Sequence, residues 1–311
     1  MKHFPTRHRG KSRRALLAAS AAIAAAALAA CSSSSTSASS SASTATPTVK
    51  AVAAVSTSEL TQPGVLKLCA DFPAPPGHFY STSGAMEGYD IDLGDQLGTE
   101  LGLKTEWVDS VFSTIILAAQ TEKCDMIWSG MSITPAREAV VSMIPYFTVG
   151  ESFITLKGNP YSLPNPATNP LGFCGHTLAA EQGSYELTLV KALSAQCTAA
   201  KKSAITITTP QDNGTALEDV MTKHADAWMT GSDLAGYVTG QHPTEIQTVG
   251  DVIDNGEYGL AIPPSRTSLI AGVVTALKTM ESDGTYAQIL KKWGQSPAQV
   301  PAVTVNPKLS S

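Results

Sequence analysis

The sequence lacks the motifs on which the commonest enzyme classes depend. It has no Gly-x-Ser-x-Gly elbow, no His-Glu-x-x-His pair and no phosphate-binding loop. The histidines beyond the first 30 residues, His78, His176, His224 and His242, are scattered, and we expect each at a surface or turn position. These absences favour a binding protein over an enzyme and give no reason to expect a metal or another cofactor.

Acidic residues are missing from the first 58 positions. Six basic residues fall within the first 14, and a nearly unbroken apolar run of sixteen residues follows at 15–30. A basic segment before a short apolar stretch is typical of a secretory signal, and the run is shorter than the about 20 residues of a membrane-spanning helix. We therefore predict that residues 1–30 are a signal peptide and that the rest of the chain is exported.

The apolar run ends in Leu28-Ala29-Ala30-Cys31. This resembles the lipobox of bacterial lipoproteins, in which the cysteine is lipidated and becomes the first residue of the mature protein. The alternative is an ordinary cleaved signal followed by an incidental cysteine. The resemblance implies a lipid anchor at Cys31, on the outer face of the cytoplasmic membrane.

Residues 31–58 form the next distinct stretch, in which Ser, Ala, Thr and Val dominate and aromatic and acidic residues are absent. Such a composition cannot bury enough apolar surface to fold. We predict a flexible tether that holds a folded body away from the membrane, although a disordered stub without function would have the same composition.

Charge and cysteine content narrow the choice of partners. Removal of residues 1–30 takes six of the 21 basic residues and none of the 26 acidic ones, which leaves a formal charge of −11. An acidic protein repels phosphate backbones, so we expect no nucleic-acid partner. The four cysteines other than Cys31 are an even number with no C-x-x-C pair, which in an oxidising compartment indicates two disulfides.

From Glu59 onward the composition is that of a globular protein, and some 250 residues suffice for one or two α/β domains. We expect strands at 65–70, 105–108 and 124–128, a helix beginning at Asp90 and another around 115–119. Alternating strands and helices indicate a parallel sheet, and ligands collect at the carboxyl ends of its strands.

The segment 129–137, Ser-Gly-Met-Ser-Ile-Thr-Pro-Ala-Arg, carries a local signal of ligand binding. Thr134 suits the N-cap of a helix and Pro135 its first position. Arg137 then lies in the first turn, where the helix dipole disfavours a cation by roughly 0.3–1 kcal/mol. This position suits an arginine that binds a carboxylate, unless Arg137 is a surface residue paired with Glu138 or another acid.

Four blocks in the chain resemble, in order, the bacterial extracellular solute-binding proteins of family 3, the polar amino-acid receptors of ABC importers. The blocks are Gly88-Tyr89-Asp90-Ile91-Asp92-Leu93, the stretch from Phe112 to Arg137 with its S-x-x-S-I-T-x-x-R core, residues 258–262, and residues 283–294. The likeness spans roughly residues 60–300.

The resemblance implies an α/β, two-lobed periplasmic-binding-protein-like fold of type II, with two hinge strands joining the lobes. Lobe 1 would comprise 59–152 plus 248–311 and lobe 2 would comprise 153–247, with crossovers near 149–154 and 246–250. A monomer would capture a small solute, a polar amino acid in the first instance, and deliver it to the permease of an ABC importer. The alternatives are a dehydratase-like enzyme of the same fold and a binder of other carboxylates.

Lobe 1 would supply the carboxylate clamp. By the resemblance, Arg137 pairs with the α-carboxylate of the ligand and the Ser132 hydroxyl lies beside it. The other matched positions are Ser129 and Gly130 on the same loop, Asp71 at the end of the first strand, and Phe112, which either packs against the ligand or belongs to the core.

Lobe 2 would supply a glycine-rich turn, Gln182-Gly183-Ser184, whose amides meet the carboxylate. Tyr185 stands where the family usually has threonine. Glu181 stands where an apolar residue is common, so it either adapts the wall to a cationic or hydroxylated side chain or is a solvated turn residue. With Asp71, Glu181 would also be the acid–base pair that a catalytic relative needs.

A further departure concerns the ammonium group. The family often has an acid that holds it where this chain has Gly231, and the nearest acid along the chain is Asp233. Asp233 or Asp71 takes over this role, or another residue does, or the ligand is not an ordinary α-amino acid. Within this fold we also expect disulfides Cys69–Cys124 in lobe 1 and Cys174–Cys197 in lobe 2.

Overall fold

The structure is a computed structural model that describes residues 51–306. Its centre is an eight-stranded mixed sheet with the order β4-β1-β5-β10-β6-β9-β7-β8. Three strands at each end of this order run parallel to one another, and two long strands between them run antiparallel to their neighbours. The strands are β1 (Val65–Ala70), β4 (Lys104–Asp109), β5 (Met126–Ile127), β6 (Ser142–Leu156), β7 (Thr177–Ala179), β8 (Thr206–Thr208), β9 (Ala227–Gly231) and β10 (Ile246–Ile262), with a separate hairpin of β2 (Phe79–Tyr80) and β3 (Met86–Glu87).

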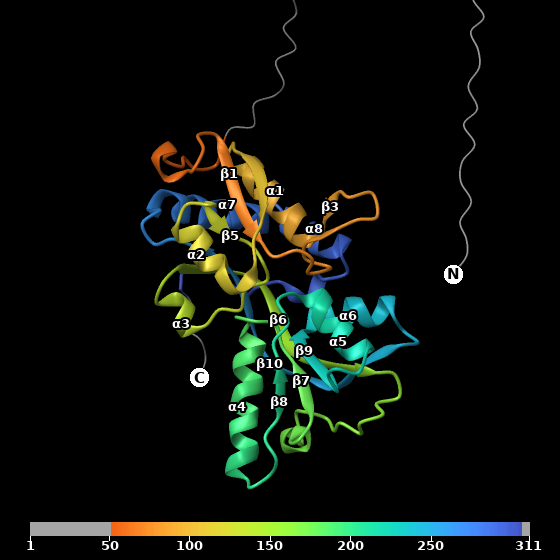
Figure 1. The fold of residues 1–311 in the computed structure, drawn as a ribbon. Helices are drawn as coiled ribbons and strands as arrows, with labels where there is room; N and C mark the ends of the chain where they lie inside the picture. Colours follow the sequence, from red (N-terminus) through yellow and green to blue (C-terminus); the bar gives the residue numbers. More distant parts are fainter. Residues whose placement is uncertain (1–50, 307–311) are drawn as a thin grey trace, which may run out of the picture. The chain divides into compact units, whose positions relative to one another are not determined.

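The strands β6 and β10 belong to both halves of the sheet (Figure 1). Residues 142–149 of β6 pair with the second half of β10, and residues 153–156 pair with its first half. The register shifts between Val249 and Gly256, where the two strands pass from one half to the other. A break in the ladder at the crossing makes this the place where the halves can bend relative to each other.

The first half, lobe 1, is covered by helices that bury one apolar face each. In α1 the side chains of Leu93 and Leu97 are fully buried, one turn apart. The helix starts after Gly88, whose φ of 140° and close approach to the Gly77 carbonyl leave no room for a side chain. The helices of this lobe are α1 (Tyr89–Glu100), α2 (Ile115–Gln120), α3 (Pro135–Glu138), α7 (Thr267–Ser282) and α8 (Thr285–Lys292), with 3-10 turns η1 (Thr57–Glu59), η2 (Phe112–Thr114) and η4 (Ser296–Ala298).

The second half, lobe 2, has its own apolar core. Phe153 of β6 stacks on Phe173 with ring centroids 4.4 Å apart, and Trp228 of β9 is buried under a second cluster. The covering elements are α4 (Tyr185–Ala199), α5 (Asn213–Met221), α6 (Ser232–Gln241) and the 3-10 turn η3 (Pro170–Phe173). Two cores on either side of the crossing strands give the chain its two lobes.

Several expectations from the sequence are confirmed. The structure contains the disulfides Cys69–Cys124 and Cys174–Cys197. Thr134 caps α3 and accepts a hydrogen bond from the Arg137 N–H at 3.3 Å. The strand expected at 124–128 is shorter, because only Met126 and Ile127 pair with their neighbours.

The expected signal peptide 1–30, the lipidation site Cys31 and the tether as far as residue 50 lie outside the described residues. Residues 51–58, expected to be tether, are instead packed on lobe 1. The Val52 N–H donates to the Glu100 carbonyl at 2.9 Å, and the Ser56 N–H donates to the Ser268 hydroxyl at 2.8 Å. The packed body therefore begins before the expected boundary at 59. No helix between residues 51 and 306 has the length and apolarity needed to cross a membrane.

Candidate ligand-binding cleft

The parallel strands of both lobes direct their carboxyl ends toward one small cavity between the lobes, of about 40 Å³. Eight of the residues expected to bind the ligand line it, and five others join them. The expected ones are Asp71, Phe112, Ser129, Gly130, Ser132, Glu181, Ser184 and Tyr185, and the others are Glu186, Asn213, Thr230, Leu234 and Tyr258. Of the remaining expected residues, Arg137, Gly183 and Asp233 lie outside the lining of this cavity.

Arg137 connects the two lobes. One guanidinium nitrogen donates to the Ser132 carbonyl at 2.6 Å, and another donates to the Gly183 carbonyl of lobe 2 at 3.2 Å. The guanidinium carbon also lies 5.5 Å from the centre of the Phe112 ring. Burial lowers the pKa of Arg137. Nearby acids, with Glu186 first among them, act in the opposite direction and favour the charged form. Two bonds leave part of the five-donor guanidinium fork available for an anion.

The start of α4 faces this arginine from lobe 2. Ser184 is the N-cap, and its hydroxyl accepts from the Leu187 N–H at 3.1 Å. The N–H groups of the first turn have no carbonyl partner within a helix, and the helix dipole favours an anion there. At Gly183 a side chain would meet Ser113 at 2.7 Å, so glycine lets the turn approach lobe 1 closely.

Two carboxyl groups face each other across the cavity, Asp71 from lobe 1 and Glu181 from lobe 2. Both side chains are 7% exposed. Burial raises the pKa of Glu181 to about 10, and a hydrogen bond to Asp71 adds to this shift. Burial also raises the pKa of Asp71. Burial and the neighbouring Asp71 carboxyl therefore favour the protonated form of Glu181, which is not the solvated turn residue that its position in the sequence allowed.

A buried network that the sequence did not reveal holds the end of β1 in place. His78 is 1% exposed, which corrects the expectation of a surface or turn role. Its Nδ1 lies 2.8 Å from Oδ2 of Asp90, and its Nε2 lies 2.9 Å from the Asp71 carbonyl. Asp90 also accepts from the Trp128 indole, and the Ser129 hydroxyl accepts from the Asp71 N–H at 2.9 Å. The network fixes the backbone that carries the Asp71 carboxyl.

The space beside Gly231 is filled by a tyrosine. A Cβ at this position would lie 2.0 Å from the Tyr258 hydroxyl oxygen, so an acid could not stand here without a rearrangement. Asp233, two residues further, accepts from the Tyr89 hydroxyl at 2.7 Å and from the Tyr258 hydroxyl at 3.3 Å. Each of its oxygens therefore accepts a hydrogen bond from a tyrosine of lobe 1.

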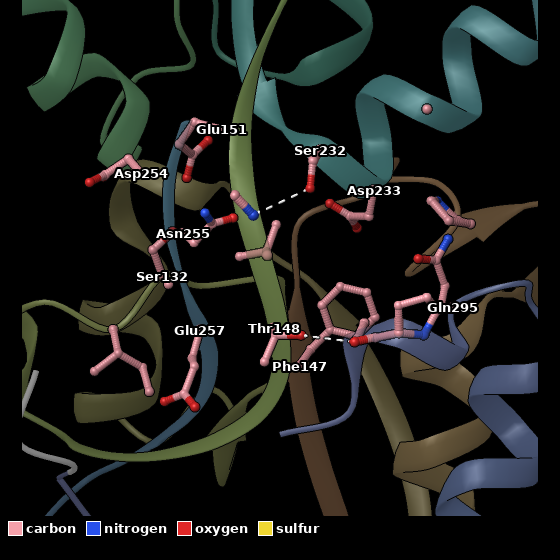
Figure 2. A pocket seen from close by; sticks show the side chains of 18 of the residues that line it. Ser132, Phe147, Thr148, Glu151, Ser232, Asp233, Asp254, Asn255, Glu257 and Gln295 are labelled. Atoms are coloured by element: carbon pink, nitrogen blue, oxygen red, sulfur yellow. Dashed lines mark hydrogen bonds between the residues drawn. The ribbon is translucent and has the colours of Figure 1, made fainter. Parts of the chain in front are cut away.

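A second and larger cavity, of about 970 Å³, surrounds the crossing strands (Figure 2). Its lining includes four acids, Glu151, Asp233, Asp254 and Glu257. Ser132 and Tyr185 line both cavities, so the two spaces adjoin.

Glu151 is an acid of this lining that the sequence did not lead us to expect at the site. It is 2% exposed, and its Oε2 has no hydrogen-bond partner within the described part of the chain. Burial raises its pKa well above the ordinary range, and Glu186, Asp233 and Asp254 add to the effect. The signal in the sequence was a single acid inside the otherwise uncharged run of β6.

Two lobes that meet around buried, chemically diverse side chains define a protein that encloses a small solute. The comparisons with known proteins agree. The model of the bacterial extracellular solute-binding proteins, family 3, matches residues 66–296. The chain belongs to this family.

Named relatives are similar to the chain in sequence over most of their length. Arginine-binding protein ArgT of Corynebacterium glutamicum is 26% identical over 247 residues, which are 79% of each chain. The ABC transporter glutamine-binding protein GlnH of Bacillus subtilis is 26% identical over 70% of this chain and 77% of its own. These relatives are named as binding proteins rather than enzymes, in agreement with the expectation from the sequence.

Two solved structures extend the likeness to three dimensions. An ancestral arginine-binding protein bound to glutamine has a TM-score of 0.68 at 28% identity and covers 75% of this chain and 98% of that one. An ancestral amino acid-binding protein, a precursor of cyclohexadienyl dehydratase, has a TM-score of 0.66 at 30% identity and covers 74% and 95%.

Proposed function

We propose that this protein captures a cationic amino acid, with arginine as the first candidate, and delivers it to the permease of an ABC importer. The relatives named above, which bind arginine or glutamine, support an amino-acid ligand. The acids of the cleft favour the cationic member of this pair.

The observation that carries the proposal is the pair formed by Asp71 and Glu181. The two carboxyls are buried and come from opposite lobes, and burial raises the pKa of both, so each favours its protonated form in the absence of a bound cation. A guanidinium or ammonium group between them would ionise both acids and bind both lobes at once. A neutral amide would satisfy them less well, since it carries no charge to balance two carboxylates.

The carboxylate end of the ligand would lie between Arg137 and the start of α4. The guanidinium supplies a charge-assisted bond, and the first-turn N–H groups after Ser184 supply the others. The proposed contacts are therefore Ser129, Gly130, Ser132 and Arg137 with Phe112 and Asp71 in lobe 1, and Glu181, Gly183, Ser184 and Tyr185 in lobe 2. Asp233 supports the site through Tyr89 and Tyr258.

Closure would follow from these contacts. The ligand-free protein would open about the crossing strands, where the β6–β10 register breaks. We place lobe 1 at 59–152 plus 248–311, with residues 51–58 packed on it, and lobe 2 at 153–247. A ligand that touches both lobes favours the closed form by the difference in its affinity for the two forms. The permease could then distinguish loaded from empty protein by shape.

The test is a binding screen on the soluble body. Residues 51–311 would be purified and titrated calorimetrically with arginine, lysine, glutamine, glutamate and the free guanidinium ion. We expect arginine or lysine to bind most tightly, with at least a tenfold preference over glutamine, because exchanging the charge at a buried carboxyl pair is worth more than about 1.4 kcal/mol. A preference for glutamine would refute the cationic assignment and keep the amino-acid one.

The anchor is tested separately. Cys31→Ser should release the full-length protein from bacterial membranes without altering the affinity of the folded body. Membrane retention of this variant would show that the lipobox interpretation is wrong.

A further inference from the structure

Glu151 stands directly opposite the position where the family's ammonium-binding acid is missing. In the antiparallel pairing of β6 with β9, Glu151 is the register partner of Gly231. Directly opposed residues of antiparallel strands carry their side chains on the same face, with Cβ positions about 5 Å apart. The carboxyl of Glu151 therefore lies on the face that an acid at 231 would occupy, displaced by one strand.

The surroundings of Glu151 call for a cation. Its side chain is buried, its Oε2 has no hydrogen-bond partner in the part of the chain that the structure describes, and it lines the larger of the two cavities (Figure 2). A buried carboxyl without a partner is costly, so such groups are normally paired. The groups that act on it most strongly are the acids Glu186, Asp233 and Asp254, and none of them can neutralise it.

The other acids near the cleft have different partners. Asp233 accepts hydrogen bonds from Tyr89 and Tyr258 on its two oxygens. Asp71 lies beside Glu181 in the smaller cavity, which does not include Glu151 in its lining. Ser132, next to the carboxylate clamp, borders both cavities, so a ligand whose carboxylate lies at Arg137 has its α-carbon near the boundary between them.

We propose that Glu151 binds the α-ammonium group of the ligand, in place of the acid that is missing at Gly231. The proposal rests on the proposed function, since it requires an α-amino acid. An acid on a strand shared by both lobes makes ammonium recognition part of the hinge itself, so the ligand's α-ammonium stabilises the crossing strands as well as the cleft. Glu186 of lobe 2, the acid that acts most strongly on the Glu151 carboxyl, lies on the other side of the same subsite.

The experiment compares ligands that differ only in the ammonium group. Arginine and 5-guanidinopentanoate, which lacks the α-amino group, are titrated into the wild type and into Glu151→Gln, Asp233→Asn and Glu106→Gln. Glu106 is an exposed strand acid at the opposite edge of lobe 1, so its variant controls for the loss of one charge. Thermal unfolding of each variant shows that it is folded.

We expect Glu151→Gln to lower the affinity for arginine at least about tenfold, because arginine loses a charge-assisted bond. The affinity for 5-guanidinopentanoate should stay within about twofold of the wild-type value, because this ligand has no ammonium group to lose. Glu106→Gln should change the affinity for neither ligand. Equal losses for both ligands would make Glu151 a structural residue, and discrimination by Asp233→Asn instead would assign the ammonium to Asp233; either result overturns the proposal.

Different results would refute the proposal of a cationic ligand and the proposal for Glu151. If the wild type prefers glutamine, the cationic assignment fails, but glutamine and its deaminated analogue glutaramate test Glu151 in the same way. If the wild type binds no α-amino acid, both proposals are wrong.

Discussion

The Nδ1 atom of His78 lies 2.8 Å from Oδ2 of Asp90, and both side chains are 1% exposed or less. Asp90 belongs to the Gly-Tyr-Asp block that begins α1, and His78 lies in the loop that leaves β1. The pair therefore fixes the first helix to the loop that carries Asp71. The other ring nitrogen of His78, Nε2, lies 2.9 Å from the Asp71 carbonyl oxygen.

His78→Ala should lower the free energy of unfolding by about 2–4 kcal/mol, because it leaves the buried Asp90 carboxyl with one partner fewer. Urea denaturation measures this change. His224→Ala is the matched control, since His224 is exposed, and it should stay within about 0.5 kcal/mol of the wild type. A His78 variant as stable as this control would show that the buried pair contributes nothing to the fold.

Some elements of the fold and site could be predicted from the sequence and others could not. Local signals predicted α3, because Thr134 and Pro135 carry their own capping chemistry. The disulfides were predicted once the resemblance supplied a topology. His78 and Glu151 were not recognised, because their roles depend on partners far along the chain: Asp71 and Asp90 for the one, Gly231 for the other. Long-range pairing is set by tertiary packing, which no local pattern specifies.

Gly231 is predicted to be intolerant of any side chain. A Cβ there would meet the Tyr258 hydroxyl at 2.0 Å and an oxygen of Asp233 at 2.8 Å, so Gly231→Ala should disrupt the contacts of Asp233 with both tyrosines. We expect the melting temperature to fall by at least about 3 °C, corresponding to about 1 kcal/mol or more in a domain of this size. Gly236, in α6, has open space around it, so Gly236→Ala should be neutral or slightly stabilising. Equal behaviour of the two variants would contradict the close packing at Gly231.

The stability of the ligand-free protein should fall as the pH rises. Glu181 has a pKa of about 10 in the folded protein against 4.5 when exposed, so between these values the folded state binds more protons than the unfolded state. The contribution of Glu181 to stability is therefore fully present below about pH 4.5 and is lost as the pH rises toward 10. The pKa values of Asp71, Glu151, Glu186 and Asp233 are raised as well, and they act in the same direction.

Melting temperatures measured from pH 5.5 to 8.5 should therefore decrease, and Glu181→Gln should flatten part of this slope because glutamine does not titrate. A saturating cationic ligand should flatten it further, since it keeps the carboxyls ionised at all these pH values. A wild-type slope of zero or of opposite sign would show that Glu181 is ionised in the folded, ligand-free protein.

The carboxylate clamp is the sharpest test of the site. Arg137→Ala should lower the affinity for arginine at least about tenfold, because a charge-assisted contact to a carboxylate is worth about 1.5–3 kcal/mol and 1.4 kcal/mol is a factor of ten.

Arg137 also donates to Gly183 of lobe 2, so the variant could weaken binding simply by loosening the closed form. Agmatine, which is arginine without its carboxylate, separates the two effects. If Arg137 acts through the carboxylate, agmatine should bind the wild type weakly and Arg137→Ala should change its affinity by less than about threefold. If Arg137 acts by joining the lobes, arginine and agmatine should lose affinity in equal measure, and the clamp assignment would be wrong.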